Sequence, residues 1–159
     1  IKNGGKYYAS AVGEVNVVEM MKEKNAVIGG EGNGGVIFPE LHYGRDALVG
    51  IALFLTYLAN KKLKMSELKS SFPQYTISKN KLALTNSTNI DLLLEKISNK
   101  YKTVNQNKID GLKLEFENEW VHMRKSNTEP IIRIYAESQN QKSAHNLGER
   151  FVEELKSMI

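Results

Sequence analysis

The sequence of 159 residues contains no cysteine. This absence excludes disulfide bonds, thiolate metal ligands and cysteine nucleophiles. A chain of this kind is compatible with the reducing cytosol, and we expect a cytoplasmic location. Proline is scarce, with three residues, and the longest apolar run, residues 47–59, is too short to cross a bilayer. We therefore expect no membrane partner, and we interpret the run as a buried helix.

A strong excess of one charge is also missing. The net charge is +4, and lysines and glutamates alternate along the chain instead of clustering. We therefore expect no nucleic-acid partner, while a mildly basic chain suits a small anionic substrate. An RNA-binding domain remains an alternative because the pI is about 9.1. That alternative requires exposed aromatic residues on a small sheet, or a basic stripe.

Hydrophobic periodicity predicts two parts. The first, residues 1–72, is expected to be a partial α/β domain with a mixed sheet and helices. Its predicted strands are residues 6–12, 26–30 and 36–38. Its predicted helices are residues 14–25, with Val15, Val18 and Met21 on one face, a long helix starting near Arg45 or Asp46, and residues 65–72. The chain starts like the interior of a domain, so we expect a fragment of a longer protein.

The second part, residues 73–159, is expected to be a small α+β domain with an antiparallel sheet and helices on one side. Pro73 lies in a predicted linker, residues 70–78. A helix should begin after Asn89 as N-cap, with Leu92, Leu93, Ile97 and Tyr101 on one face. The predicted strands are residues 110–116, 120–124 and 131–137, the first two forming a hairpin that turns near Asn118. The last predicted helix is residues 142–158.

A glycine-rich stretch, GGEGNGG, occupies residues 29–35 and contains G-x-G-x-x-G at Gly30, Gly32 and Gly35. A dinucleotide-binding loop needs a helix directly after these glycines and an acidic residue about 20 positions further on. Here VIFPEL follows, and no acidic residue lies between residues 51 and 58. The P-loop lysine is also missing, so the stretch does not predict a nucleotide site.

The same stretch carries a carboxylate and a carboxamide one residue apart, Glu31 and Asn33. In an extended segment, two such side chains can point the same way. Glu accepts hydrogen bonds from hydroxyl groups, whereas Asn both donates and accepts, which suits the vicinal hydroxyls of a sugar. A glycine-rich hairpin with no ligand is the alternative.

A second loop, RKSNTEP at residues 124–130, joins two predicted strands and concentrates hydrogen-bond donors. The candidate phosphate-binding residues are Arg124, Ser126, Asn127, Thr128 and, in the next strand, Arg133. Guanidinium groups match the several oxygens of a phosphate, and hydroxyls with backbone N–H groups complete an anion site. A polar turn with two surface arginines is the alternative.

Together these segments resemble the α-D-phosphohexomutases, a family that includes phosphoglucomutase, phosphomannomutase and phosphoglucosamine mutase. The resemblance rests on VGEVNVVEMM, on GGEGNGG followed by RDA at residues 45–47, and on DGLKLEFENEWVHMRKSNTEPIIRIYAES. It covers nearly the whole chain. It implies the second half of domain 3, residues 1–72, followed by domain 4, residues 73–159, of a four-domain enzyme. The remaining N-terminal domains of the same protein would then be partners of this chain.

The resemblance implies that Glu31 and Asn33 contact the sugar and that Arg124, Ser126, Asn127, Thr128 and Arg133 hold a phosphate. Many family members have histidine where this chain has Gly35. The family interconverts hexose 1-phosphate and hexose 6-phosphate through a phosphoserine enzyme and a bisphosphorylated sugar, with Mg²⁺.

The family's phosphoserine loop and its aspartate-rich metal loop are both absent, and no D-x-D pattern occurs in the sequence. We therefore expect no catalytic or metal-binding residue in this chain, and we expect the chain to be inactive alone. A non-catalytic phosphosugar- or anion-binding module is the alternative function.

Overall fold

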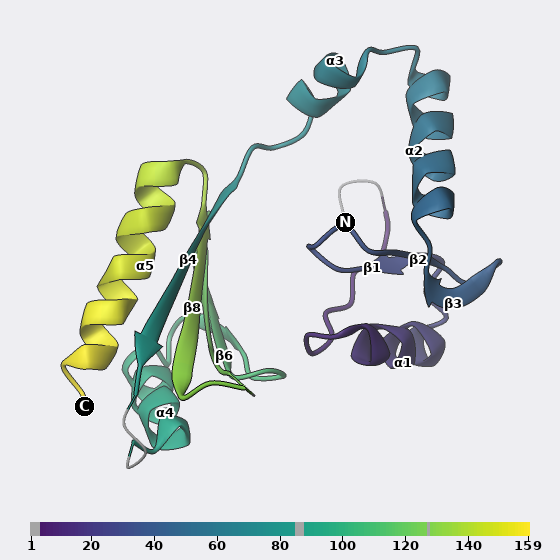
Figure 1. Cartoon of the computed structure of the whole chain (residues 1–159). Helices are drawn as coiled ribbons and strands as arrows, with labels where there is room; N and C mark the ends of the chain where they lie inside the picture. The colour runs from purple at the N-terminus through teal and green to yellow at the C-terminus, as the bar shows by residue number, and fades with distance from the viewer. Residues whose placement is uncertain (1–3, 85–87, 127) are drawn as a thin grey trace. The chain divides into compact units, whose positions relative to one another are not determined.

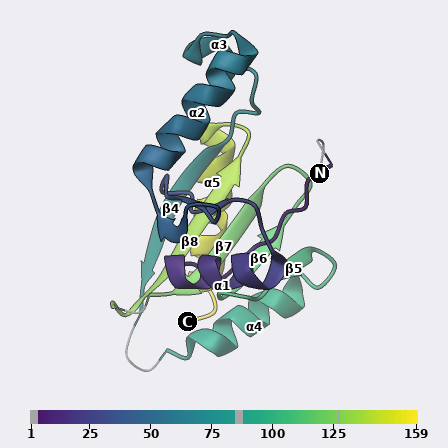
Figure 2. The same ribbon diagram turned by 90° about the vertical axis from the view of Figure 1, so that its right-hand side faces the viewer.

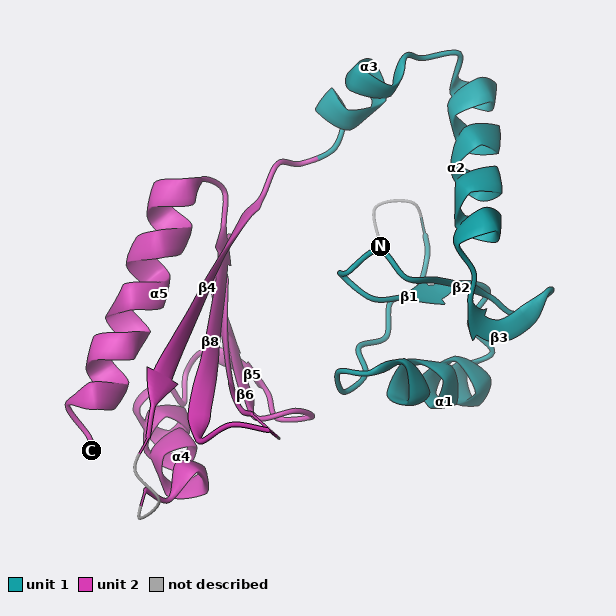
Figure 3. Cartoon of the chain, viewed as in Figure 1, with its two compact units in different colours: residues 1–72 teal, residues 73–159 magenta. Residues whose placement is uncertain are grey.

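The computed structural model describes residues 4–84, 88–126 and 128–159. The chain divides into two compact units, residues 1–72 (unit 1) and residues 73–159 (unit 2), which Figure 3 shows in two colours. Each unit has its own sheet.

The described residues of unit 1 form a three-stranded sheet and three helices, whose arrangement Figure 1 shows. The elements in chain order are α1 Glu14–Lys24, β1 Gly29–Gly30, β2 Val36–Phe38, β3 His42–Arg45, α2 Ala47–Lys61 and α3 Met65–Ser70. The strands pair in the order β1-β2-β3, and both pairings are antiparallel. The expected mixed sheet is therefore antiparallel in its described strands. Short turns connect consecutive strands here, whereas a parallel pair needs a long crossover.

The buried apolar residues in the described part of unit 1 are Met21, Ile37 and Leu68. Met21 packs directly on the backbone of β1, because a Cβ atom at Gly29 would lie 2.1 Å from its sulfur. Ile37, at the centre of β2, is fully buried. A side chain at residue 29 would therefore require the end of the Met21 side chain to move.

The apolar run predicted as a buried helix forms α2, but no residue of α2 is buried. Leu48 is 78% exposed and Ile51 is 55% exposed. Apolar composition favours the helix, while burial depends on what packs against it, and the described chain covers only part of its surface. Within the described ranges, every helix is too short or too polar to span a membrane.

Two further expectations for unit 1 need correction. Residues 6–12 form no strand, and Tyr7 is 81% exposed. Residues of high β-propensity become a strand only beside a neighbouring strand, and the described residues provide none here. The strand β3 was not predicted, because its sequence HYGR carries no alternating apolar pattern.

Unit 2 is built on a five-stranded antiparallel sheet in the order β4-β8-β7-β6-β5 (Figure 2). The elements in chain order are β4 Thr76–Ala83, α4 Ile90–Lys100, β5 Asn105–Asn107, β6 Leu112–Glu115, β7 Trp120–Lys125, β8 Ile131–Ser138 and α5 Gln141–Lys156. Every second residue of β8 is buried, as expected for a sheet with one covered face. The predicted hairpin, the third strand and the last helix are confirmed.

Helices α4 and α5 cover one face of this sheet, because their apolar residues join a single core with the inward residues of the strands. Asn89 caps α4 by accepting a hydrogen bond from the Leu92 N–H at 3.2 Å, as predicted. Leu93 and Ile97 are buried, but Leu92 is 54% exposed, and Leu94 takes its place in the core. One residue of the predicted apolar face of α4, Leu92, was therefore wrong.

The start of unit 2 also differs from the prediction. The predicted linker, residues 70–78, ends in strand, since β4 begins at Thr76 and pairs with β8 along its whole length. The sequence of β4 is mostly polar and therefore does not predict a strand. In the structure, its exposed positions alternate with positions covered by α5. The three-residue strand β5 was not predicted either, because NQN has no β-favouring residue.

Candidate sugar and phosphate site

The glycine-rich stretch forms the tight turn between β1 and β2. The Glu31 N–H donates to the Gly35 carbonyl at 3.1 Å, and the Gly34 N–H donates to the Glu31 carbonyl at 3.0 Å. Gly34 has φ +97°, a conformation that glycine adopts without strain. A Cβ atom at Gly30 would lie 2.4 Å from the Gly35 carbonyl oxygen, so the two arms of the turn meet at backbone contact distance.

Glu31 and Asn33 lie side by side at this turn. Asn33 Nδ2 donates to Glu31 Oε2 at 3.4 Å, and Asn33 Oδ1 accepts from the Gly35 N–H at 3.0 Å. The Glu31 side chain is 16% exposed. The turn therefore places a carboxylate and a carboxamide next to each other. The spacing argument assumed an extended segment, whereas this stretch forms a turn.

Two residues to which the sequence gave no role, Arg45 and Glu14, form an ion-pair chain with Glu31. Arg45, at the end of β3, lies with Nη1 3.6 Å from Glu31 Oε2 and donates from Nε to Glu14 Oε2 at 2.8 Å. A Cβ atom at Gly35 would lie 2.6 Å from Arg45 Cδ, so the arginine fills the space of a side chain at residue 35. The RDA segment marked Arg45 in the sequence but gave no contact for it.

A polar cavity of about 490 Å³ opens beside the turn. It is lined by Glu14, Asn33, Gly34, Gly35, Val36, Arg45, Asp46 and Ala47. Asp46 also caps α2 by accepting from the Val49 N–H at 3.0 Å, and it contacts His42 Nε2 at 3.2 Å. The Val49 N–H hydrogen bond, followed by that with His42, holds the pKa of Asp46 below its ordinary value. Asp46 is therefore an anion near neutral pH.

The second predicted loop joins the ends of β7 and β8. Arg124 and Arg133 are directly opposite each other in the β7–β8 register. Gly111 lets the neighbouring strand approach, because a Cβ atom there would lie 2.9 Å from Arg124 Cα. The Ser126 N–H donates to the Ile131 carbonyl at 3.0 Å, and the Ile131 N–H donates to the Glu129 carbonyl at 2.8 Å. These bonds close the loop around the ends of the two strands.

Three of the predicted phosphate ligands come together here. Arg133 Nη2 lies 3.4 Å from the hydroxyl of Ser126, which is buried, and 3.4 Å from Glu129 Oε2. Arg124 Nη1 lies 3.8 Å from Asp110 Oδ2. The Tyr135 side chain, and to a smaller extent the negative charge of Glu129, raises the pKa of Arg133. Arg133 is a permanent cation, as arginine is in proteins generally.

The remaining two predicted ligands are Thr128 and Asn127. Thr128 is exposed at the tip of the loop. Asn127 lies outside the described residues. The loop thus presents two guanidinium groups, a buried hydroxyl and an exposed threonine, a set of donors that suits a phosphate group.

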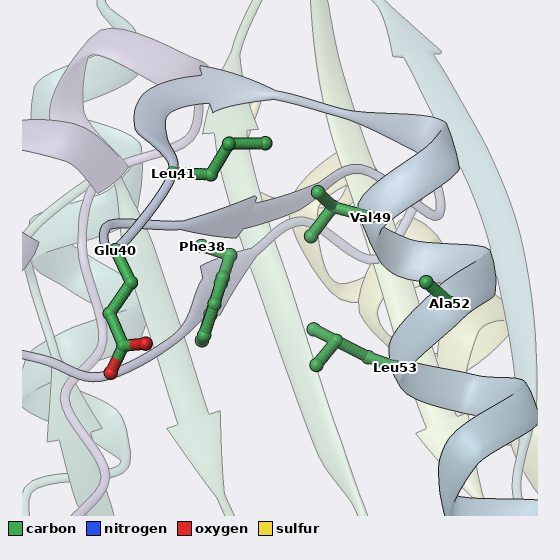
Figure 4. A pocket seen from close by; sticks show the side chains of 6 residues that line it. All are labelled: Phe38, Glu40, Leu41, Val49, Ala52 and Leu53. Atoms are coloured by element: carbon green, nitrogen blue, oxygen red, sulfur yellow. The ribbon is translucent and has the colours of Figure 1, made fainter.

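A further pocket, of about 330 Å³, lies between the β2–β3 turn and α2 (Figure 4). Its lining is apolar apart from Glu40 and consists of Phe38, Glu40, Leu41, Val49, Ala52 and Leu53. It offers no convergent set of polar groups. Among the described residues, no three His, Asp or Glu side chains gather in a way that could hold a metal ion.

The β1–β2 turn carries groups that can hydrogen-bond to hydroxyls, and the β7–β8 loop carries donors that suit an anion. Comparison with known proteins gives the family. The model of phosphoglucomutase/phosphomannomutase, alpha/beta/alpha domain III, matches residues 1–75, and that of the C-terminal domain of the same family matches residues 81–154. The chain belongs to the phosphohexomutase family and comprises its C-terminal part. The expected fold class is confirmed, an α/β part followed by a small antiparallel α+β domain.

Individual relatives agree. A phosphoglucosamine/phosphogalactosamine mutase of Sulfurisphaera tokodaii is 37% identical over 93% of this chain and 32% of its own length. A phosphoglucomutase/phosphomannomutase of Thermococcus kodakarensis is 36% identical over 96% of this chain and 34% of its own. A phosphoglucomutase/phosphomannomutase family protein of Burkholderia thailandensis has a solved structure with TM-score 0.79, 25% identity and coverage of 98% of this chain and 33% of its own. The chain spans about a third of the length of these relatives.

Proposed function

We propose that this chain provides the sugar- and phosphate-recognition elements of an enzyme that interconverts hexose 1-phosphate and hexose 6-phosphate. In the whole protein, a phosphoserine would donate its phosphoryl group, and a bisphosphorylated sugar would form and reorient before the second transfer. The relatives are named as mutases of this type. We also propose a cytoplasmic enzyme.

The observation that carries the proposal is the cluster of Arg124, Ser126 and Arg133 at the β7–β8 turn. Two guanidinium groups lie directly opposite each other beside a buried hydroxyl, and like charges opposite each other destabilise a sheet. Asp110 lies 3.8 Å from Arg124 and Glu129 lies 3.4 Å from Arg133, so each carboxylate offsets one of the two charges. A phosphate that stays on the sugar during transfer would contact both guanidinium groups at once and reduce their repulsion further. Phosphoryl transfer depends mainly on such positioning and charge stabilisation.

The β1–β2 turn would hold the sugar itself. Glu31 would accept hydrogen bonds from sugar hydroxyls, and the Asn33 carboxamide would donate and accept beside it. Arg45 and Glu14 would keep the Glu31 carboxylate in place.

The chemical step would depend on residues outside this sequence. The family's phosphoserine and Mg²⁺ loops have no counterpart here, and the described residues do not fit a metal ion. The chain alone would therefore bind without catalysing. A phosphosugar-binding module without catalytic partners is the alternative, and the reading frame that encodes this chain distinguishes the two, since the mutase requires both loops upstream.

The experiment titrates the isotope-labelled chain with glucose 1-phosphate, glucose and inorganic phosphate and follows the amide shifts by NMR. Charge-assisted hydrogen bonds contribute about 1.5–3 kcal/mol each, against an association cost of roughly 4–15 kcal/mol. Binding to one half-site should therefore be about millimolar. We expect shifts at residues 124–133 with both phosphate-containing ligands and at residues 30–35 with glucose 1-phosphate.

Arg124→Ala should abolish the shifts at the phosphate loop. The matched control is Lys125→Ala, which removes the same charge from the neighbouring, exposed position of β7. Equal losses in both variants would indicate general electrostatic attraction and contradict a built phosphate site. Absence of shifts in the wild-type chain, even at high ligand concentration, would contradict the proposed role of the loop.

A further inference from the structure

A third cation lies in line with the two arginines of the phosphate loop. Lys81 of β4 is directly opposite Arg133 of β8, which in turn is opposite Arg124 of β7. Figure 1 shows β4 and β8 running side by side. Directly opposed residues have Cβ atoms about 4.5–5.5 Å apart, so the three cations form one continuous row across three strands.

The burial pattern places this row on the face of the sheet that α4 and α5 leave open. The neighbours Leu82, Ile132 and Met123 are all buried in the core. Alternation along a strand therefore directs Lys81, Arg133 and Arg124 to the opposite face. The row also lies at the loop end of the sheet, because the Leu84 N–H, just after β4, donates to the Pro130 carbonyl at 2.9 Å.

The row carries more positive charge than its neighbours balance. Arg124 pairs with Asp110, and Arg133 pairs with Glu129. In the described part of the chain, Lys81 has no ion pair. Three adjacent cations beside two carboxylates favour a further anion, and the flexible four-carbon stem of a lysine can bring its ammonium group to it.

We propose that Lys81 is the third cation of the phosphate site and binds a phosphate monoester dianion together with Arg124 and Arg133. This inference rests on the proposed function of the loop and adds a ligand from a strand that the loop sequence does not contain. Lys79 is not part of the site. It lies two residues earlier on the same face, opposite Tyr135, with Nζ 5.8 Å from the centre of that ring.

The test uses the whole chain with inorganic phosphate at about pH 8, where the dianion predominates. Phosphate affinity is measured by NMR at the Ser126 and Arg133 amides, in the wild type and in Lys81→Met, Lys81→Arg and Lys79→Met. Loss of a charge-assisted hydrogen bond should weaken binding at least about tenfold in Lys81→Met. Lys81→Arg should retain most of the affinity, and Lys79→Met should change it less than about twofold.

Thermal unfolding, monitored through Trp120 fluorescence, is a second measurement. It distinguishes a phosphate ligand from a lysine with a merely structural role. In chloride at matched ionic strength, Lys81→Met should unfold at the same temperature as the wild type or higher, because it relieves repulsion in the row. In phosphate, the same variant should gain less stability than the wild type. A structural role would instead lower the unfolding temperature in chloride and leave the phosphate gain unchanged.

The outcomes separate the two proposals. Wild-type binding with equal affinities for Lys81→Met and Lys79→Met would overturn the role of Lys81 and leave the loop assignment intact. If the wild-type amides of residues 124–133 do not respond to phosphate, the proposed function of the loop and the inference on Lys81 both fail.

Discussion

Unit 1 and unit 2 bury their apolar residues very differently. Unit 2 surrounds its sheet face with the apolar sides of α4 and α5, so residues such as Phe151, Leu114 and Ile134 are fully inaccessible. The described part of unit 1 buries few large side chains, and its most apolar helix, α2, contributes none of them. The β7–β8 loop therefore extends from a sheet with a large apolar core, whereas the β1–β2 turn extends from a sheet with few buried residues.

This difference shows what an apolar pattern can and cannot predict. The apolar residues that follow strand and helix periodicity in unit 2 pack against one another within residues 73–159. In this unit the same pattern therefore predicts both the element and its buried face. The run in α2 predicts a helix equally well, but no residue of α2 is buried among the described residues. The predictions below test this contrast, starting with the largest expected effect.

Phe151→Ala should destabilise unit 2 most. The Phe151 ring is fully buried and lies 5.3 Å from that of Tyr101, centre to centre. Removing it should cost about 3–5 kcal/mol, a large share of the roughly 5–15 kcal/mol that stabilises a domain. Urea unfolding followed through Trp120, the one tryptophan of the chain, measures the loss. Leu92→Ala on the exposed side of α4 is the control, and an equal loss there would contradict the assigned core.

Ile37→Ala should unfold unit 1 selectively. Ile37 is fully buried in β2, and truncation of such a residue costs about 2–5 kcal/mol. Hydrogen exchange at residues 29–45 should accelerate, while the Trp120 unfolding curve of unit 2 stays unchanged. Ile51→Gln on exposed α2 should leave exchange in β2 as it is. A change in the Trp120 curve with Ile37→Ala would show that the two units unfold together.

Asp46→Ala should loosen the first turn of α2. The difference from wild type should appear only at a pH at which the wild-type Asp46 carboxylate is charged. The pKa of Asp46 in the folded chain lies below the ordinary 3.8. A lowered pKa means that the carboxylate stabilises the fold above that ordinary value, and that this contribution disappears as the pH falls through the folded pKa. We expect several-fold faster exchange of the Val49 amide near neutral pH, and no difference from wild type in strong acid. A difference that persists in acid would contradict the capping role.

The fold was predictable where a residue pattern and the segment it packs or pairs with are close together in the sequence. The cap at Asn89, the β6–β7 hairpin and the last helix, α5, all follow from short-range spacing. The strand β4 was missed because its paired residues in β8 lie 48 to 62 positions further along the chain, and because two of its exposed positions are lysines. The expected strand at residues 6–12 failed for the opposite reason, since its sequence favours a strand that has no partner in the described chain.

The candidate site was predictable only within each loop. Hydrogen-bonding chemistry singled out Glu31 with Asn33, and Arg124 with Ser126, because these residues are close in sequence. Arg45 reaches Glu31 from another strand, and Lys81 joins the arginine row from more than 40 residues away. Such neighbours follow from strand register, which depends on the packing of the whole sheet.

The lysines of β4 have a consequence beyond ligand binding. β4 is a long strand at one edge of the unit 2 sheet, and the opposite edge is the three-residue β5. An exposed long edge is a template on which strands of other molecules can stack into fibrils. Lys79 and Lys81 repeat along this edge, so a second copy of β4 aligned beside the first would bring ammonium groups together. The edge that presents a cation to the ligand therefore also resists self-assembly.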